Sequence, residues 1–318
     1  MTLRPRPFLQ VDVFTALPYL GNPLAVVLDG TGLSDEAMQR FAHWTNLSET
    51  TFVLAPTPEG AAAGADYRVR IFTPGGELPF AGHPTLGTCH AWLAHGGQPR
   101  EAGVVRQECA VGVVALRRAD GIEHGSSNRW AFAAPAMRRA APDATRLAAV
   151  CAALGLHPTQ VKAAQVLNNG PEWLGLLIDS PDTLMALTPD HTALKALGEK
   201  VGVAALSAPP ENTPLIARNS REARAFDRPS QTPSASEPDL WVRAFVDVLG
   251  VAEDPVTGSL NASLAQWLMA DGVLPTRYQA TQGQALGRDG QVFLSQDAQG
   301  QVWVGGDVVR CVSGEVWL

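Results

Sequence analysis

The second half of the chain repeats a segment of the first half, 176 residues further on. Glu77-Leu-Pro-Phe-Ala-Gly82 aligns without a gap with Glu253-Asp-Pro-Val-Thr-Gly258. Further matches are Ala94 with Ala270, Gly96 with Gly272 and, with a three-residue slip, Arg70–Phe72 with Arg243–Phe245. A repeat of this length predicts two copies of one domain, not a short-period array. Each copy places a glycine directly before an uncharged helical stretch, so a site between the copies would receive two helix N-termini.

The composition agrees with two domains. The 318 residues are 46% hydrophobic and 17% charged, which suffices for two full-sized cores. We expect a first half over 1–130, completed by the C-terminal strand near 308–318, and a second half over 131–307. The stretch at 218–239 is rich in Ser, Pro and charged residues, and we expect it to be a mobile surface insertion.

Strands are expected to dominate both halves, because many short runs are rich in β-branched and aromatic residues. The expected strands are Phe8–Thr15, Ala25–Leu28, Thr51–Ala55, Tyr67–Thr73, Val104–Cys109, Val111–Arg117, Leu174–Asp179, Pro214–Arg218, Leu240–Val246, Gln291–Ser295, Val302–Val304 and Val308–Val312. Three amphipathic helices are expected at Asp35–Trp44, with Ser34 as N-cap, at Leu147–Leu154 and at His191–Leu197.

Two further helices are expected to be buried. Pro84–Ala94 and Leu260–Ala270 contain no Asp, Glu, Lys or Arg, and a helix without a charged face is typically surrounded by protein. Pro84 suits the first helical position, and Gly96 and Gly272 lie where C-caps are expected. The sequence therefore predicts an α+β protein with two pseudo-symmetric halves, each a curved, mostly antiparallel sheet around one central helix.

Charge and cysteine content limit the partners and the compartment. The formal net charge is −7 and no Lys/Arg-rich run occurs, so nucleic acid and anionic membrane are not expected as partners. A small carboxylate remains possible, because helix dipoles act locally. The four cysteines form no C-x-x-C pair, which argues against a zinc site and suits a reducing cytoplasm. No signal peptide and no transmembrane run is recognised.

The two glycines that begin the uncharged helices are the first candidate site residues. Gly82 and Gly258 would let a ligand approach the backbone, and the free N–H groups that follow could hold a carboxylate. Either glycine alone could simply permit a tight turn between strand and helix. Because both copies keep the glycine in register, we expect a substrate-binding role for Gly82 and Gly258.

Three ionisable residues stand near these glycines or near a strand start. Glu49 directly precedes an apolar strand, where desolvation would raise its pKa and make it a usable base, although it could also be a surface-turn residue. His83 stands where the second copy has Ser259, and Asp254 stands where the first copy has Leu78. Each copy thus carries an ionisable group that the other lacks, as an asymmetric active site would require. Helix capping and a place in the helical first turn are the alternative roles for His83 and Asp254.

Other site types have little support. His83, His90 and His95 are not spaced by four, so the sequence predicts no metal site. A Walker loop, a G-x-G-x-x-G fingerprint and a G-x-S-x-G elbow are all missing from the sequence.

Six motifs in order resemble the PhzF-like family of phenazine-biosynthesis isomerases. They are Val11–Thr15, Gly21–Val26, Asn46–Thr50, Phe72–Pro74, Glu77–Thr85 and Glu253–Ser259, and the resemblance extends to the closing Val304–Gly306. It implies a diaminopimelate-epimerase-like fold and a cofactor-free isomerase, typically a homodimer, with a small carboxylate substrate between the halves.

The resemblance also implies roles for individual residues. The catalytic glutamate of the family falls on Glu49, its site histidine on His83, its aspartate on Asp254 and its serine on Ser259. In the phenazine enzymes, whose substrate is the cyclic amino acid dihydro-3-hydroxyanthranilate, the glutamate takes an allylic proton from one ring carbon and returns it to another. We therefore expect Glu49, His83 and Asp254 to be catalytic, and Gly82, Gly258 and Ser259 to bind substrate.

One departure from the related enzymes and one main alternative accompany this prediction. Related epimerases and proline-type racemases use two cysteine thiols, one before each glycine, but Ala81 and Thr257 stand at those positions here. A two-thiol racemase is therefore not expected. The main alternative is a catalytically silent protein that binds or senses a small carboxylate on the same fold.

Overall fold

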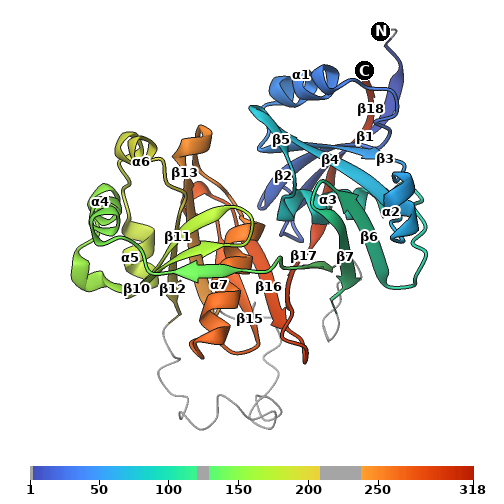
Figure 1. The fold of residues 1–318 in the computed structure, drawn as a ribbon. Helices are drawn as coiled ribbons and strands as arrows, with labels where there is room; N and C mark the ends of the chain where they lie inside the picture. Colours follow the sequence, from blue (N-terminus) through green and yellow to red (C-terminus); the bar gives the residue numbers. More distant parts are fainter. Residues whose placement is uncertain (1–2, 120–128, 208–237) are drawn as a thin grey trace, which may run out of the picture.

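The computed structural model describes residues 3–119, 129–207 and 238–318, which form two lobes (Figure 1). The first lobe contains β1 (Pro5–Val13), β2 (Asn22–Val27), α1 (Asp35–Thr45), β3 (Glu49–Leu54), α2 (Pro58–Ala62), β4 (Tyr67–Thr73), β5 (Gly76–Leu78), α3 (Gly82–Ala94), β6 (Val104–Cys109), β7 (Gly112–Arg118), β8 (Trp130–Ala133) and the C-terminal β18 (Val308–Trp317). The second contains β9 (Arg138–Ala140), α4 (Ala144–Leu154), β10 (Val161–Asn168), β11 (Glu172–Ile178), α5 (Pro181–Ala186), α6 (His191–Leu197), β12 (Val201–Leu206), β13 (Leu240–Val246), β14 (Val251–Glu253), α7 (Gly258–Ala270), β15 (Arg277–Gln282), β16 (Gly290–Gln296) and β17 (Val302–Gly306).

The two lobes share one pattern of strand pairing. In the first lobe β2–β3 and β4–β6 are parallel, and in the second lobe β11–β12 and β13–β15 are parallel. The other pairs, including β1–β2, β3–β4, β10–β11 and β12–β13, are antiparallel. The repeat seen in the sequence is therefore a repeat of topology, and the predicted fold class is confirmed.

The lobes are joined by a crossing of strands. β8 pairs antiparallel with β17, so the two sheets run into one another. The chain then leaves β8 for β9, which pairs with β10, and leaves β17 for β18, which pairs with β1. Each lobe thus receives one strand from beyond the crossing, at equivalent positions. The domain limits at 130 and 131 remain a prediction.

Helices α3 and α7 lie inside the sheets of their lobes (Figure 1). Most residues of both helices are buried, as expected for helices without charged side chains. Both begin two residues earlier than predicted, at Gly82 and Gly258, so Pro84 occupies the third helical position and not the first. Proline is tolerated there because the first four N–H groups of a helix have no partner within the helix.

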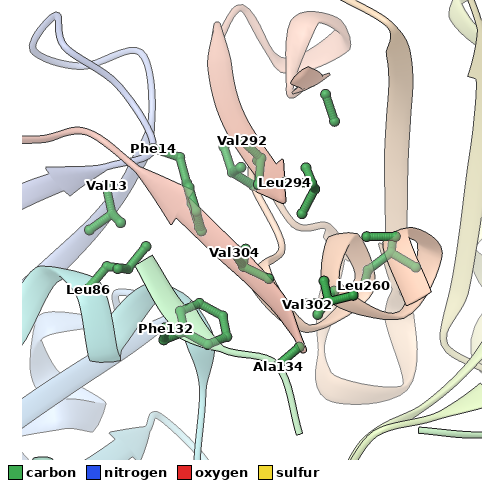
Figure 2. Close-up of a cluster of buried hydrophobic side chains, with 14 of the residues drawn as sticks. Val13, Phe14, Leu86, Phe132, Ala134, Leu260, Val292, Leu294, Val302 and Val304 are labelled. Atoms are coloured by element: carbon green, nitrogen blue, oxygen red, sulfur yellow. The ribbon is translucent and has the colours of Figure 1, made fainter. Parts of the chain in front are cut away.

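One hydrophobic core runs through the crossing. Figure 2 shows Phe132 of β8 and Val304 of β17 between the side chains of the two lobes. Leu86 of α3 and Leu260 of α7 belong to the same buried cluster. Phe14, which follows β1, is fully buried here despite a φ of 65°, a left-handed conformation that non-glycine residues seldom adopt. The crossing is therefore part of the hydrophobic core, and side chains of both lobes pack against it.

The remaining large helices cover the outer faces. Met38, Phe41 and Ala42 of α1 pack on the outer face of the first sheet, and α4, α5 and α6 cover the second. Every helix in the described part of the chain is too short or too polar to cross a membrane.

Most predicted elements have ends within one to three residues of the observed ones, but several observed strands were not predicted. The predicted strand at Pro214–Arg218 and nearly all of the predicted insertion lie outside the described residues. β10, β12 and β15 were missed because their sequences are rich in Ala, Gly and Gln, which have little preference for strands. Pairing with neighbouring strands, and not local preference, makes these segments extended.

The repeat also duplicates an arginine–glutamate pair. In the first lobe Arg70 donates to both carboxylate oxygens of Glu77, at 2.7 and 2.6 Å. In the second lobe Arg243 donates in the same way to Glu253, at 3.0 and 2.8 Å. Each pair joins a long strand to the short strand that leads to the central helix. The pairs therefore fix the position of each helix start relative to its sheet.

The two pairs differ in burial. The side chain of Glu77 is 39% exposed, whereas that of Glu253 is 5% exposed. Arg243 also donates to the carbonyl oxygens of Leu184 and Leu187, both at 3.1 Å. Loss of Arg243 would therefore leave a buried carboxylate and two buried carbonyls without their partner.

We predict unequal costs for the two equivalent substitutions. Arg243→Met should reduce the free energy of unfolding by about 3–5 kcal/mol, because it leaves the charge of Glu253 buried and uncompensated. Arg70→Met should cost roughly 1 kcal/mol or less, because water can solvate Glu77. Urea denaturation of both variants tests this, and equal losses would contradict it. Adding Glu253→Gln to Arg243→Met should restore part of the lost stability.

Candidate active site

The N-termini of α3 and α7 meet where the lobes join. A Cβ atom built on Gly258 would lie 3.2 Å from the Cα of Gly82 and 3.4 Å from the backbone nitrogen of His83. A Cβ atom on Gly82 would lie 3.2 Å from the Cα of Gly258 and 2.7 Å from the ring of Phe132. Both positions therefore require glycine for close packing. Gly82 and Gly258, which align in the sequence repeat, are neighbours in the structure.

These two helices also lack the usual N-terminal cap. The N-cap residues Ala81 and Thr257 make no capping side-chain hydrogen bond, whereas side chains cap α1, α4, α5 and α6. The N–H groups of the first turn carry partial positive charge and need acceptors. Two such ends next to each other form a place suited to an anion.

Glu49 is the first residue of β3 and lies against this junction. It follows α1 closely, after Asn46 ends that helix in a left-handed conformation. Its carboxylate oxygen Oε2 lies 3.3 Å from Nε2 of His83, and the two side chains are 15% and 5% exposed. The turn after α1 therefore brings Glu49 to the second residue of α3, which sequence distance alone did not show.

Burial keeps this pair uncharged near neutral pH. Desolvation, together with the nearby charge of Asp254, raises the pKa of Glu49 to about 8. Desolvation lowers the pKa of His83 to about 3, although a hydrogen bond with the backbone of Pro23 acts in the other direction. Near pH 7 the pair is thus mainly a carboxylic acid beside a neutral imidazole, and not an ion pair.

Asp254 brings a second carboxylate from the other lobe. It lies between β14 and α7, and its Oδ2 accepts a hydrogen bond of 2.6 Å from the hydroxyl of Thr257. Burial raises the pKa of Asp254 to about 6, against the effect of hydrogen bonds from Thr257 and Asn22. This carboxylate is therefore charged at neutral pH, at a point where its charge opposes ionisation of Glu49.

Asn22 links the two lobes at this point and was missed as a site residue. Its Nδ2 donates to Oδ1 of Asp254 and to the carbonyl of Val256, both at 2.9 Å, and lies 3.5 Å from Nδ1 of His83. The side chain is fully buried. A sequence signal existed, since Asn22 is a polar residue between Gly21 and Pro23 at the start of an apolar strand, but nothing in that pattern names its partners.

Several buried polar atoms gather here without hydrogen-bond partners. Within the described residues, Oε2 of Glu49, Nε2 of His83 and Oδ1 of Asn22 are buried and unpaired, since the 3.3 Å approach of the first two lacks hydrogen-bond geometry. Buried polar atoms are normally paired, so such a group indicates a functional site.

Ser259, the remaining predicted residue, is the second residue of α7. Its hydroxyl accepts a hydrogen bond of 3.3 Å from Nε1 of Trp173. The structure thus brings Gly82, His83 and Glu49 together in one lobe, and Asp254, Gly258 and Ser259 together at the start of α7 in the other. Asn22 connects the two groups.

Thiols take no part in this arrangement. The residues before the two glycines are the N-caps Ala81 and Thr257. Cys89 lies within α3 and is fully buried in the core, where desolvation raises the pKa of its thiol. In residues 3–119, 129–207 and 238–318, no three His, Cys, Asp or Glu side chains gather as metal ligands would.

The sequence matches a known family over most of its length. The family model of phenazine biosynthesis-like proteins, PhzC-PhzF, matches residues 11–314. Trans-2,3-dihydro-3-hydroxyanthranilate isomerase of Pseudomonas aeruginosa is 33% identical over 98% of this chain and 99% of its own. Antisense-enhancing sequence 1 of Schizosaccharomyces pombe is 32% identical over 98% of both chains. A PhzF-family phenazine biosynthesis protein of Bacillus anthracis shares the fold, with a TM-score of 0.78, 21% identity and coverage of 99% of this chain and 100% of its own.

We predict that Glu49→Gln stabilises the protein in a pH-dependent way. The pKa of Glu49 is higher in the folded state than its ordinary value of 4.5, so folding favours the protonated form. The wild type therefore loses stability relative to the variant as the pH rises from 4.5 to about 8. The gain should be near zero at about pH 4 and on the order of 5 kcal/mol at about pH 9.

Urea denaturation across this pH range provides the measurement. Glu315→Gln, which replaces an exposed carboxylate on β18, is the matched control and should change stability little at any pH. A gain for Glu49→Gln that is the same at both ends of the range would refute the raised pKa.

Proposed function

The chain belongs to the PhzC-PhzF family of phenazine biosynthesis-like proteins, and from this premise we propose that it moves a proton between two carbon atoms of a small carboxylate-bearing substrate. We propose an amino-acid-like or cyclic substrate, Glu49 as the general base and acid, and no cofactor. The observation that carries the proposal is the buried contact between Glu49 and His83 beside two uncapped helix N-termini.

The helix ends supply the binding site for the carboxylate. N–H groups after Gly82 and Gly258 donate hydrogen bonds, and the helix dipoles favour negative charge at the same place. Removing a proton from carbon leaves charge that must be delocalised and stabilised. Donors that are already oriented toward the substrate carboxylate can stabilise this charge without rearranging during the reaction.

Glu49 has the properties of the proton carrier. A carboxylate with a pKa of about 8 is a stronger base than an ordinary glutamate, and a fraction of it is ionised at neutral pH. One carboxylate can take a proton from one carbon and return it to another on the same face of the substrate. No second base is required, and the reaction transfers no electrons to or from an external partner.

His83 and Asp254 control the state of Glu49. His83 stays neutral, and its Nε2 lies 3.3 Å from Oε2 of Glu49, so it adds no positive charge that would lower the pKa of Glu49. The charge of Asp254 raises the pKa of Glu49 and so strengthens the base. Asn22 holds Asp254 by a hydrogen bond from the opposite lobe.

The substrate class follows from relatives and from the site together. Trans-2,3-dihydro-3-hydroxyanthranilate isomerase is the name of one relative, and its substrate is a cyclic carboxylate with an amino group. For this chain we propose the wider class of small amino-acid-like or cyclic carboxylates. We also propose a homodimer, on the family resemblance, and a cytoplasmic location, in keeping with the four free cysteines.

We predict that Glu49→Gln abolishes proton exchange but keeps binding. The test ligands are cyclic carboxylates in deuterated water, and NMR follows deuterium entering their C–H positions. Exchange should fall by about 10²–10⁴-fold, because the amide cannot act as a base. Binding of the carboxylate, measured by titration calorimetry, should stay within about threefold, and Glu315→Gln should exchange like the wild type.

The alternative function is a catalytically silent carboxylate-binding or regulatory protein. One of the relatives carries a name that describes no isomerase activity. If the wild type binds carboxylates but exchanges no proton with any of them, this alternative replaces the proposal.

We predict a rise of the exchange rate with pH. Glu49 must be ionised to accept a proton, so kcat/KM should fall about tenfold for each pH unit below the pKa of about 8 and reach a plateau above it. Asp254→Asn removes a negative charge near Glu49, so the midpoint of its remaining activity should move to lower pH. Exchange rates between about pH 5 and pH 10 provide the test. An unchanged midpoint would show that Asp254 does not act on Glu49.

A further inference from the structure

A second polar contact lies at the start of α7, on the side of the turn between β10 and β11. Asn169 in this turn is 3% exposed, and its Nδ2 donates a hydrogen bond of 3.1 Å to the backbone carbonyl of Ser259. A carbonyl oxygen can only accept, so this bond fixes which way the amide of Asn169 points. Its Oδ1 then faces away from that carbonyl, and it is buried without a hydrogen-bond partner among the described residues.

The neighbouring hydroxyl of Ser259 is fixed in the opposite sense. The indole N–H of Trp173 can only donate, so Ser259 Oγ accepts this bond at 3.3 Å. The hydroxyl proton of Ser259 remains free to donate to another group. Ser259 in the first turn of α7 thus presents a hydroxyl donor, and its backbone carbonyl binds Asn169, whose amide oxygen is an unpaired acceptor.

We propose that Asn169 is a specificity-determining residue that accepts a hydrogen bond from an amino or hydroxyl group of the substrate, near the carboxylate bound at the helix ends. This rests on the proposed function, because it assumes that the carboxylate lies at the N-termini of α3 and α7. A buried acceptor without a partner is unfavourable, and a ligand with an N–H or O–H group removes this cost. A ligand without such a group leaves the oxygen unpaired and is bound less tightly.

The test compares three carboxylates of one shape. They are cis-2-aminocyclohexanecarboxylate, cis-2-hydroxycyclohexanecarboxylate and cyclohexanecarboxylate, and their dissociation constants for the full chain are measured by titration calorimetry. The wild type should bind at least one of the first two about tenfold more tightly than the third. Whether the amino or the hydroxyl compound is preferred identifies the donor.

Two substitutions separate the roles at this site. Asn169→Leu should bring the ratio between the dissociation constants of cyclohexanecarboxylate and of the preferred donor-bearing ligand to about one. The dissociation constant of cyclohexanecarboxylate itself should change little. Trp173→Phe frees the hydroxyl of Ser259 from its fixed orientation. It should therefore weaken the binding of all three ligands by a similar factor and keep the preference for the donor-bearing ligand. Asn169→Asp retains an acceptor oxygen and should also keep the preference, which separates recognition from a folding defect.

Three results would overturn the proposal. The first is that the wild type binds all three ligands equally. The second is that the Asn169→Leu variant keeps the preference for the donor-bearing ligand, and the third is that this variant binds all three ligands more weakly by the same factor. Failure of the proposed function looks different. In that case the ligands bind without deuterium exchange, or none of the three binds the wild type.

Discussion

The contact between the first turns of α3 and α7 is the constraint on which the rest of this structure depends. The two helices approach so closely that Gly82 and Gly258 leave room for no side chain between their backbones. Both ends carry partial positive charge, and neither has a capping side chain. Bringing two such ends together is unfavourable unless an anion or other acceptor compensates them. The crossing of β8 with β17 and the core around Phe132 hold them there, so the proposed anion site is a consequence of how the two lobes are joined.

The ionisable groups around this contact lower the stability of the fold, and the same burial gives them pKa values that suit proton transfer. Glu49, His83 and Asp254 all have pKa values displaced toward their neutral forms, which shows that each charged form is poorly solvated. Stability lost in this way is offset by the continuous core and by pairs such as Arg243 with Glu253. Strain and desolvation are typically concentrated at active sites, since a well-solvated glutamate would be a weak base.

The repeat explains both the symmetry and its local failure. The arginine–glutamate pairs and the glycines that begin the central helices are kept in both lobes, because they position the helices. The ionisable groups are not kept, because His83 aligns with Ser259 in the repeat and Leu78 aligns with Asp254. One lobe therefore supplies the carboxyl group of Glu49 and the imidazole of His83, and the other supplies a carboxylate and a hydroxyl. Asn22 crosses between the lobes and connects these groups through hydrogen bonds.

The sequence by itself determined the repeat, the two uncharged central helices, the glycine at each helix start and the residue types around them. These features are local or depend on pattern, so composition, spacing and register are enough to identify them. Only the tertiary structure decided that Glu49 lies against His83, that Asn22 donates a hydrogen bond to Asp254, and that Asn169 donates one to the carbonyl of Ser259. Such contacts join residues far apart in the chain, and an asparagine has the same local preferences whether it faces water or a buried carboxylate. Their effects on pKa and hydrogen bonding arise from desolvation, which exists only once the lobes have closed around them.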